Sequence, residues 1–432
     1  MHINAVPKPR QKAGNLLFSG NLQLPAYLMA ALTPPIVWWV GQGQDLRHPI
    51  LIATLIPLAV AVLVTWYILS RLREYARTRH LSYVFPVNFL AFAGVLSGIA
   101  ILRVAYSIPM FGMGAFGTVL FSYISTAHNR GLRRPHFIVG GGRSSEVRIE
   151  GQYLPAPSLI ELETLVQARQ LNGALVADLH YDHPDEWERL FAKAALAGIP
   201  VYHYRQVAEM QTGQVKITHL SENELGSLIP NVPYVATKRL IDIVGSVLLL
   251  PLLAVPLLVI ALLIKLDSKG PVLFVQERVG FRGRTFRMVK FRTMRERAAI
   301  TEEEALRNDA MTRDGDDRIT RVGQFLRKTR IDELPQVLNI LRGEMSWIGP
   351  RPEAESLAKW YESELPFYSY RHIVRPGITG WAQVNQGHVT DVSDVNAKLR
   401  FDFYYVKNIS LWLDFLIVLK TFRVILTGNG AK

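Results

Sequence analysis

Long uncharged runs of hydrophobic residues dominate the first third of the chain. Four of them follow one another, at residues 22–40, 49–70, 81–102 and 109–127. About 20 helical residues span the roughly 30 Å hydrocarbon core of a bilayer, because a helix rises about 1.5 Å per residue. The pattern therefore predicts four transmembrane helices within residues 21–130. A buried bundle in a soluble protein is disfavoured, since four such runs exceed what a soluble core needs.

Basic residues cluster at alternate ends of these runs, at 8–12, 71–79 and 130–134. Cytoplasmic loops of membrane proteins carry an excess of Lys and Arg. Both ends of the four-helix unit are therefore expected on the cytoplasmic side, with residues 1–20 as a cytoplasmic tail. Arg103 falls at the outer end of its helix, where a long side chain can reach water, and we assign it no function.

Strand patterns alternate with helical stretches after Pro135. Short apolar segments at 136–139, 173–178 and 198–202 are typical of buried strands. Strands that alternate with helices favour a parallel sheet, so we predict a small Rossmann-like α/β domain over residues 135–225.

The glycines at 140–142 suggest dinucleotide binding, but the G-x-G-x-x-G pattern fails because Ser145 stands where the third glycine should be. A tight turn is the favoured interpretation. His180, His183 and His203 follow no recognised metal-ligand spacing, and we expect them at solvated or core-edge positions.

A fifth apolar run, within residues 238–265, is flanked by basic residues on both sides and interrupted by Pro251 and Pro256. A straight fifth span would carry the rest of the chain outside, away from nucleotides. We therefore predict a re-entrant helix that enters the cytoplasmic leaflet, breaks at the prolines and returns to the same face. Arg239 and Asp242, on adjacent turns, are expected to pair near the interface.

Composition agrees with a membrane protein. Hydrophobic residues make up 49% of the chain, yet the formal net charge is +13. Because the apolar residues lie in long runs, this combination indicates basic cytoplasmic surfaces and no nucleic-acid partner. Cysteine is absent, which excludes disulfides, thiolate metal sites and a cysteine nucleophile.

A stripe of apolar and aromatic residues at 411–426 predicts a last helix that lies at the membrane interface or in the core.

The candidate chemistry lies in residues 329–352. Pro335 is tolerated only in a first helical turn, which makes Asp332 the expected N-cap and Glu333 the first helical residue. Gly343 is the expected stop, and one apolar helix face is predicted from Leu334, Val337, Leu338 and Leu341. Two carboxylates at the positive end of a helix dipole stay ionised, so Asp332 could be a nucleophile or a metal ligand. An ordinary capped helix is the alternative.

Cations around this segment suit a polyanionic substrate such as a pyrophosphate. Arg351 stands between two prolines, and Arg375 precedes Pro376 and Gly377. Lys290, Arg292 and Arg318 add further positive charge, although a basic membrane-facing surface would use the same residue types.

Several long motifs occur in order and together resemble the bacterial sugar transferases, the monotopic phosphoglycosyl transferases. They are KRLID at 238–242, VKFRTM at 289–294, the run at 318–352, RPGITGWAQVN at 375–385 and FDFYYVKN at 401–408. The resemblance covers residues 234–432. The upstream part is similar to the larger polyprenyl-phosphate hexose-1-phosphate transferases, which carry four transmembrane helices and a Rossmann-like domain. One departure is that the family's membrane helix usually breaks at Ser-Pro, whereas Pro256 follows Ala254-Val255 here.

The resemblance implies a reaction and roles for residues. Asp332 would attack the β-phosphate of a nucleotide diphosphate sugar, expected to be a UDP-hexose, and release UMP from a covalent phosphosugar intermediate. Undecaprenyl phosphate would then accept the sugar phosphate, as the first membrane step of exopolysaccharide, capsule or O-antigen synthesis. Glu333 would orient the site, with Mg²⁺ held by both carboxylates and phosphate bound by Lys290, Arg292, Arg318, Arg351 and Arg375. The implied location is the bacterial inner membrane, with the catalytic domain cytoplasmic and a homodimer left open.

Two other functions are weighed against this one. A catalytically inactive nucleotide-sugar sensor or scaffold for polysaccharide export is disfavoured by the intact Asp332-Glu333 pair. An oxidoreductase or dehydratase that uses the central domain is disfavoured by the missing third glycine.

Overall fold

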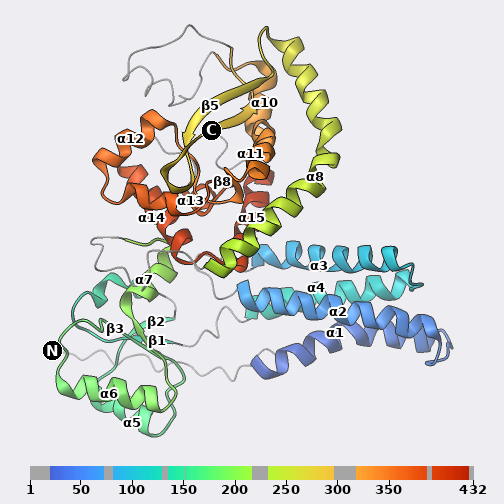
Figure 1. Cartoon of the computed structure of the whole chain (residues 1–432). Coiled ribbons are helices and arrows are strands. Elements are labelled where there is room, and N and C mark those ends of the chain that lie inside the picture. Colours follow the sequence, from blue (N-terminus) through green and yellow to red (C-terminus); the bar gives the residue numbers. More distant parts are fainter. Residues whose placement is uncertain are drawn as a thin grey trace. The chain divides into compact units, whose positions relative to one another are not determined.

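The computed structural model describes residues 20–72, 81–128, 135–150, 152–216, 232–295, 318–386 and 392–427 (Figure 1). The chain divides into two compact units, Met1–Thr212 and Gly213–Lys432. The predicted cytoplasmic tail lies outside the described residues except for Gly20, as do the basic clusters except for Arg71. The domain boundary predicted at residue 225 also falls outside them.

The four apolar runs each form one helix, named α1 (Gly20–Gly41), α2 (Pro49–Leu72), α3 (Leu81–Leu102) and α4 (Ile108–His128). Each is long and apolar enough to cross a membrane. Large hydrophobic side chains point outward from them, with Phe85 69% exposed and Phe116 70% exposed. Such a surface is suited to lipid, because apolar side chains that contact hydrocarbon are not exposed to water.

Helices α1 and α4 approach each other closely because small residues line their contact. A Cβ atom on Gly117 would lie 2.2 Å from the backbone oxygen of Ala30, so only glycine fits. The same contact buries a hydrogen bond from Gln23 Nε2 to Ser125 Oγ of 2.8 Å. Small residues and buried polar pairs are the usual means by which membrane helices associate.

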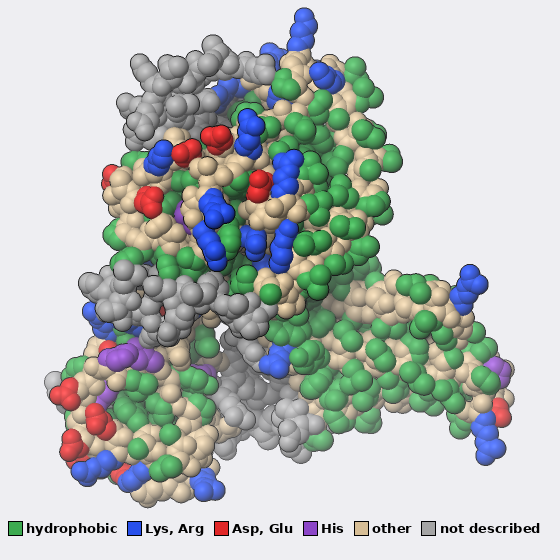
Figure 2. Space-filling model, viewed as in Figure 1, with side chains coloured by type: hydrophobic (Ala, Val, Ile, Leu, Met, Phe, Trp, Pro, Cys, Tyr) green, Lys and Arg blue, Asp and Glu red, His purple; other side chains and the backbone are tan. Residues whose placement is uncertain are grey.

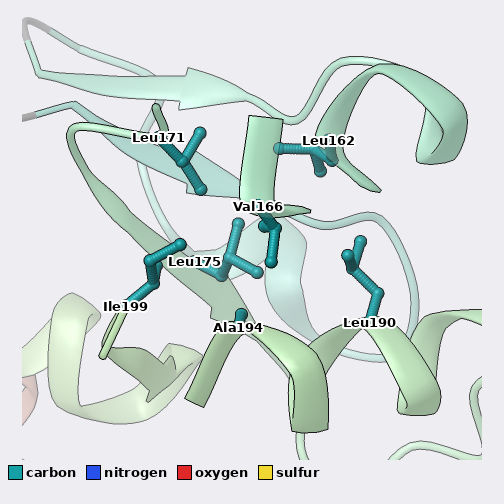
Figure 3. Packing of buried hydrophobic residues seen from close by; sticks show 7 residues of the cluster. All are labelled: Leu162, Val166, Leu171, Leu175, Leu190, Ala194 and Ile199. Carbon is teal, nitrogen blue, oxygen red and sulfur yellow. The ribbon is translucent and has the colours of Figure 1, made fainter. Parts of the chain in front are cut away.

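The central segment contains a four-stranded parallel sheet in the order β2-β1-β3-β4. Its strands are β1 (His136–Ile138), β2 (Tyr153–Pro155), β3 (Ala174–Ala177) and β4 (Val201–His203). The three predicted strands are present, and the sheet is parallel as predicted. Strand β2 was missed because three residues that end in proline show no periodicity. Helices α5 (Leu159–Gln167), α6 (Asp185–Leu196) and α7 (Tyr204–Thr212) complete the domain. The core between α5, α6 and β3 consists of aliphatic side chains (Figure 3).

The second unit begins with α8 (Val232–Asp267) and the hairpin β5 (Leu273–Val279) and β6 (Thr285–Phe291). Then follow α10 (Arg321–Thr329), the 3₁₀ turn η6 (Ile331–Gln336), α11 (Val337–Arg342), β7 (Ser346–Ile348), α12 (Glu355–Glu364), η7 (Tyr368–Ile373), β8 (Gly377–Thr379), α13 (Trp381–Gln386), α14 (Val392–Lys407) and α15 (Leu411–Thr427). Strands β7 and β8 pair in parallel. Trp381, Tyr405 and Leu413 are buried in this unit, so α13, α14 and α15 are core helices.

Helix α15 has one buried and one exposed face. Leu413, Leu416 and Ile417 are fully buried, whereas Leu411 and Phe422 are 49% and 59% exposed. The buried face makes α15 a helix of the core, and an interfacial position for its exposed apolar side chains stays a prediction. The predicted stripe is divided between the two faces, because Leu416 and Leu419 are buried whereas Leu411 and Phe422 are exposed.

Helix α8 is continuous through Pro251 and Pro256, so the predicted break at the prolines is wrong. Each proline removes only one backbone hydrogen bond, which bends a long helix without ending it. Figure 1 shows α8 as an arc along one side of the second unit. Its first part packs on α11 and β7, and its last part packs on α10, so both ends are held by one compact unit. The middle is exposed and apolar (Figure 2), with Leu252 75% exposed and Leu258 70% exposed.

Candidate active site

The Asp332-Glu333 pair lies in the turn η6, which starts after a backbone reversal. Arg330 has a left-handed conformation with φ of 60°, and the N–H of Glu333 donates to the carbonyl of Arg330 at 3.3 Å. Asp332 is therefore inside a 3₁₀ turn and caps no helix, which corrects the predicted N-cap. The predicted stop is confirmed, because Gly343 ends α11 with φ of 85°.

The buried face of α11 differs from the predicted one. Val337, Asn339 and Ile340 are buried, whereas Leu338 is 40% exposed and Leu334 and Leu341 are half-buried. The reason is the 3₁₀ turn before the helix, which has 3.0 residues per turn where the prediction assumed 3.6 throughout.

The two adjacent carboxylates have different partners. Glu333 Oε1 accepts hydrogen bonds from Arg351 Nη2 at 3.0 Å and Arg330 Nη1 at 3.4 Å. Asp332 Oδ1 is buried and has no hydrogen-bond partner among the described residues. Both side chains are under 10% exposed. One carboxylate is thus neutralised by arginine, and the other keeps an oxygen for a substrate or a cation.

Their pKa values shift in opposite directions. Burial, followed by the charge of Glu333, raises the pKa of Asp332 to about 6. Burial also acts to raise the pKa of Glu333, but Arg351 and Arg330 outweigh it and lower that pKa. At neutral pH both groups are ionised, and Asp332 is the more basic nucleophile.

Lys290 on β6 faces this pair, because β6 packs against η6. Burial, followed by repulsion from Arg278, lowers the pKa of Lys290 to about 8, and the charge of Asp332 opposes the shift. The Lys290 ammonium lies 5.1 Å from the centre of the Phe274 ring. It is a cation at neutral pH, held in a mostly dry position beside the carboxylates.

The backbone at Arg351 and Pro352 is held by two arginines, the buried Arg371 and the partly buried Arg278. Arg371 Nη2 donates to the Arg351 carbonyl at 2.8 Å, and Arg278 Nη1 donates to the Pro352 carbonyl at 2.9 Å. Arg371 is only 2% exposed and pairs with Asp402 at 2.8 Å. The sequence interpretation missed Arg278, Arg371 and Asp402. Asp402 lies in the motif FDFYYVKN, to which the sequence analysis assigned no role. Nothing in the neighbouring sequence indicates that Asp402 pairs with a distant arginine.

Two of the predicted phosphate ligands, Arg292 and Arg375, bind other groups, and for Arg318 the structure gives a backbone contact. Arg292 is 4% exposed and donates to the carbonyl and hydroxyl of Ser268 at 2.8 and 2.9 Å. Arg375 Nε donates to the Gly343 carbonyl at 3.0 Å, at the end of α11. The backbone carbonyl of Arg318 accepts from the N–H of Arg295 at 2.9 Å. The structure brings Lys290 and Arg351 to the carboxylate pair, whereas Arg292 and Arg375 hold helix ends.

The predicted pair of Arg239 and Asp242 does not form. Arg239 instead donates to the carbonyls of Ile340 and Leu341 at 2.6 and 3.0 Å, and Asp242 accepts from the N–H of Trp347 at 3.2 Å. The free carbonyls at the end of α11 are better partners for a guanidinium than the Asp242 carboxylate, which already accepts a hydrogen bond from β7. These bonds fix α8 to the helix that follows the carboxylates.

Asp178, His180 and His203 gather at the ends of β3 and β4, with ligand atoms within 4.8 Å of one another. His180 Nδ1 lies 2.8 Å from His203 Nε2. However, His203 Nδ1 accepts from the N–H of Arg205 at 3.1 Å, which places the ring proton on Nε2. A ligating histidine normally donates from its second nitrogen, so this arrangement fits a hydrogen-bonded cluster better than a metal site.

The glycine turn of the same domain is filled by protein. Asp178 Oδ2 accepts from the N–H of Arg143 at 2.9 Å, and a Cβ atom on Gly142 would lie 2.4 Å from that oxygen. The segment after the turn is the short 3₁₀ helix η3 (Ser144–Glu146). Because a carboxylate occupies the backbone donors that would bind a pyrophosphate, the turn does not fit a dinucleotide.

The carboxylate pair fits a hard divalent cation. Its donors are carboxylate oxygens, which Mg²⁺ prefers, and Asp332 Oδ1 is a buried acceptor without a hydrogen-bond donor among the described residues.

Comparison with known proteins points to one class of enzyme. The family described as "Bacterial sugar transferase" matches residues 233–428. The chain is 40% identical over 415 residues to a protein of Aeromonas hydrophila named UDP-N-acetylgalactosamine-undecaprenyl-phosphate N-acetylgalactosaminephosphotransferase, with 94% of each chain covered.

Two further relatives match about half of the chain or less. A UDP-glucose:undecaprenyl-phosphate glucose-1-phosphate transferase of Caulobacter vibrioides is 43% identical over 208 residues, which are 48% of this chain and 76% of that protein. A protein of Escherichia coli with the same name is 41% identical over 186 residues, 43% of this chain and 39% of that protein.

Proposed function

Because the chain belongs to the bacterial sugar transferase family and is a phosphoglycosyl transferase, we propose that it moves a sugar 1-phosphate from a UDP-sugar to undecaprenyl phosphate and releases UMP. The observation that carries this proposal is Asp332, a buried carboxylate near Lys290 and the arginine-bound Glu333, with one oxygen that has no hydrogen-bond partner among the described residues. The names of the relatives supply the substrate classes.

The first step uses Asp332 as the nucleophile. A carboxylate oxygen forms a bond to the β-phosphorus of the UDP-sugar, and the bond from that phosphorus to the UMP oxygen breaks with its electron pair. Attack by an anion on an anionic phosphorus requires nearby positive charge, which Lys290 supplies directly. Arg351 keeps Glu333 ionised and in place. Mg²⁺ held by Asp332 and Glu333 would neutralise charge on the phosphate oxygens of the UDP-sugar and of the departing UMP.

In the second step an oxygen of undecaprenyl phosphate attacks the phosphorus of the phosphosugar-Asp332 intermediate. The bond between phosphorus and the carboxylate oxygen breaks, so Asp332 returns to its ionised form and a lipid diphosphate sugar is released. The buried, mostly dry surroundings of Asp332 protect the acyl phosphate from water.

The long apolar helices support a proposal for the position of the site relative to the membrane. We propose that α1 to α4 cross the bacterial inner membrane and that the exposed middle of α8 enters its cytoplasmic leaflet. Support for re-entry comes from the two ends of α8, which both pack on the same unit. A helix that crossed the membrane would separate its ends. The catalytic unit is then cytoplasmic, where UDP-sugars and lipid phosphates meet.

UMP release by the detergent-purified full chain tests this function. A panel of UDP-sugars with Mg²⁺ is assayed with and without undecaprenyl phosphate, using wild type, Asp332→Asn and the exposed-site control Lys359→Gln. Wild type and the control are expected to turn over with lipid, and chelation of Mg²⁺ to stop them. Asp332→Asn is expected to lose at least a thousandfold in rate.

Intact-mass measurement without lipid should show a phosphosugar adduct on wild type and none on Asp332→Asn. UMP release that survives in Asp332→Asn would identify a different nucleophile. A folded wild-type protein that releases no UMP from any donor would favour the sensor or scaffold function.

A further inference from the structure

Three consecutive hydrophobic side chains at the start of β5 are exposed. Leu273 is 40% exposed, Phe274 41% and Val275 49%. Side chains alternate between the two faces of a strand, so a strand that covers a core buries at least every second one. The partner strand β6 meets this condition, because Phe286 and Met288 are buried on one face and Val289 and Phe291 on the other. Residues 273–275, here called the β5 strip, therefore offer an apolar surface on both faces.

The β5 strip is continuous with the apolar surface of α8. Val272, which precedes it, packs on the buried cluster of Ile264, Phe291 and Leu326 where the end of α8 meets α10. Around this cluster further apolar side chains are exposed, among them Leu266 at 75% and Phe325 at 61%. The strip thus extends the surface by which α8 is proposed to enter the leaflet.

The middle residue of the β5 strip, Phe274, lies beside a cation of the site. Phe274 pairs directly with Lys290 across the hairpin, and the Lys290 ammonium lies 5.1 Å from the Phe274 ring centre. The charges of Lys290 and Asp332 interact. An apolar surface therefore ends at a cation that faces the nucleophile, which matches a ligand with a hydrocarbon chain and a phosphate head.

We propose that the β5 strip holds the first isoprene units of the lipid acceptor and directs its phosphate to Lys290 and Asp332. This inference rests on the proposed function and assigns the strip to the second step alone. The nucleotide sugar, which has no hydrocarbon chain, makes no use of it. A second function, general anchoring in the bilayer, is distinguished by the experiment.

The test compares Phe274→Ser with Phe422→Ser, a control on α15 whose side chain is more exposed at 59%. The Michaelis constant for a water-soluble short-chain isoprenyl phosphate and the burst of UMP without acceptor are measured for the full chain. Phe274→Ser is expected to raise the acceptor KM about tenfold, from the loss of about half of a buried phenylalanine. In Val275→Ser, a change in the same strip on the face of the strand opposite Phe274, the burst and the KM for the UDP-sugar should stay within twofold, and Phe422→Ser should match wild type.

Other outcomes overturn the inference. Equal effects of the two substitutions would assign the strip to anchoring, and an unchanged acceptor KM would remove it from the acceptor site. Loss of the burst would place Phe274 in the first step. If Phe274→Ser does not fold, Val275→Ser carries the same expectation. Wild type without lipid-dependent turnover would refute the proposed function itself.

Discussion

At the scale of single residues, the site separates two neighbouring carboxylates by their partners. Glu333 is paired with Arg351 and Arg330, while Asp332 keeps a free oxygen among the described residues. The arginine pairs stabilise Glu333 as an anion, and its charge makes Asp332 a stronger base. Asp332 and Glu333 are neighbours in the sequence, but their different roles come from the arginine side chains that contact Glu333.

A pH prediction follows from the two perturbed groups. Asp332 is deprotonated above its pKa of about 6, and Lys290 stays charged below its pKa of about 8. UMP release is expected to rise through pH 6 and fall through pH 8, measured as kcat/KM at fixed Mg²⁺. A metal ion competes with the proton on Asp332, so higher Mg²⁺ should move the acid limb to lower pH. A basic limb that persists in Lys290→Gln would exclude Lys290 as its cause.

At the scale of elements, one buried side chain joins the two halves of the site. Asn339 on α11 accepts from the N–H of Val289 and donates to the carbonyl of Arg287, both on β6. It thereby fixes Lys290 on β6 relative to η6. The predicted apolar face of this helix gave no indication of such a role, because the partner strand lies about fifty residues earlier.

Asn339→Ala should destabilise the second unit by about 2–4 kcal/mol, since it leaves a buried N–H and a buried carbonyl without partners. Thermal unfolding of the detergent-purified protein measures this as a lower midpoint. Asn408→Ala is the control, because the Asn408 amide donates only within its own helix, to the carbonyl of Tyr404. Equal shifts for both variants would contradict the role given to Asn339.

Helix α4 carries a second prediction at this scale. Gly117→Val would place a Cβ atom against the backbone of Ala30, and backbone cannot move aside as a side chain can. We expect Gly117→Val to lower the aggregation temperature in detergent by several degrees. Gly112→Val on the same helix should leave it unchanged, since nothing lies within 4 Å of a Cβ atom there. A drop for both would mean that α4 tolerates no branched residue for reasons of conformation alone.

At the scale of the whole molecule, the second unit carries every described residue of the proposed site and a core of its own. The family match, at residues 233–428, falls within this unit. Its first residues also belong to that core: Trp381 Nε1 donates to the Gly213 carbonyl at 2.8 Å, and the N–H of Val215 donates to the Arg400 carbonyl at 2.9 Å.

Two truncations test this independence. A chain of residues 213–432 is expected to release UMP at a rate within tenfold of the full chain. A chain of residues 232–432 should unfold at a lower temperature, because the buried Trp381 N–H loses its acceptor, at about 1–3 kcal/mol. Both chains are compared with the full chain by thermal unfolding and by the UMP assay. An inactive but folded 213–432 chain would show that catalysis needs the first unit.

The sequence alone determined the features that depend on neighbours along the chain. Runs of apolar residues predicted four long helices and the position of the fifth, the alternation of strands with helices predicted the parallel sheet, and Gly343 marked the end of α11. The motif around Asp332 gave the family. These signals are local because helix length, strand alternation and turn conformation arise within a few residues.

Only the tertiary structure determined which partner each charged side chain contacts. Arg239, Arg375 and Arg351 look equivalent in the sequence, yet two of them bind carbonyls at the end of α11 and one binds Glu333. A guanidinium binds a buried acceptor that has no other donor after packing. In this protein such an acceptor lies as far as about a hundred residues away in the sequence. Likewise α8 stays whole through two prolines because both of its ends are held by one unit.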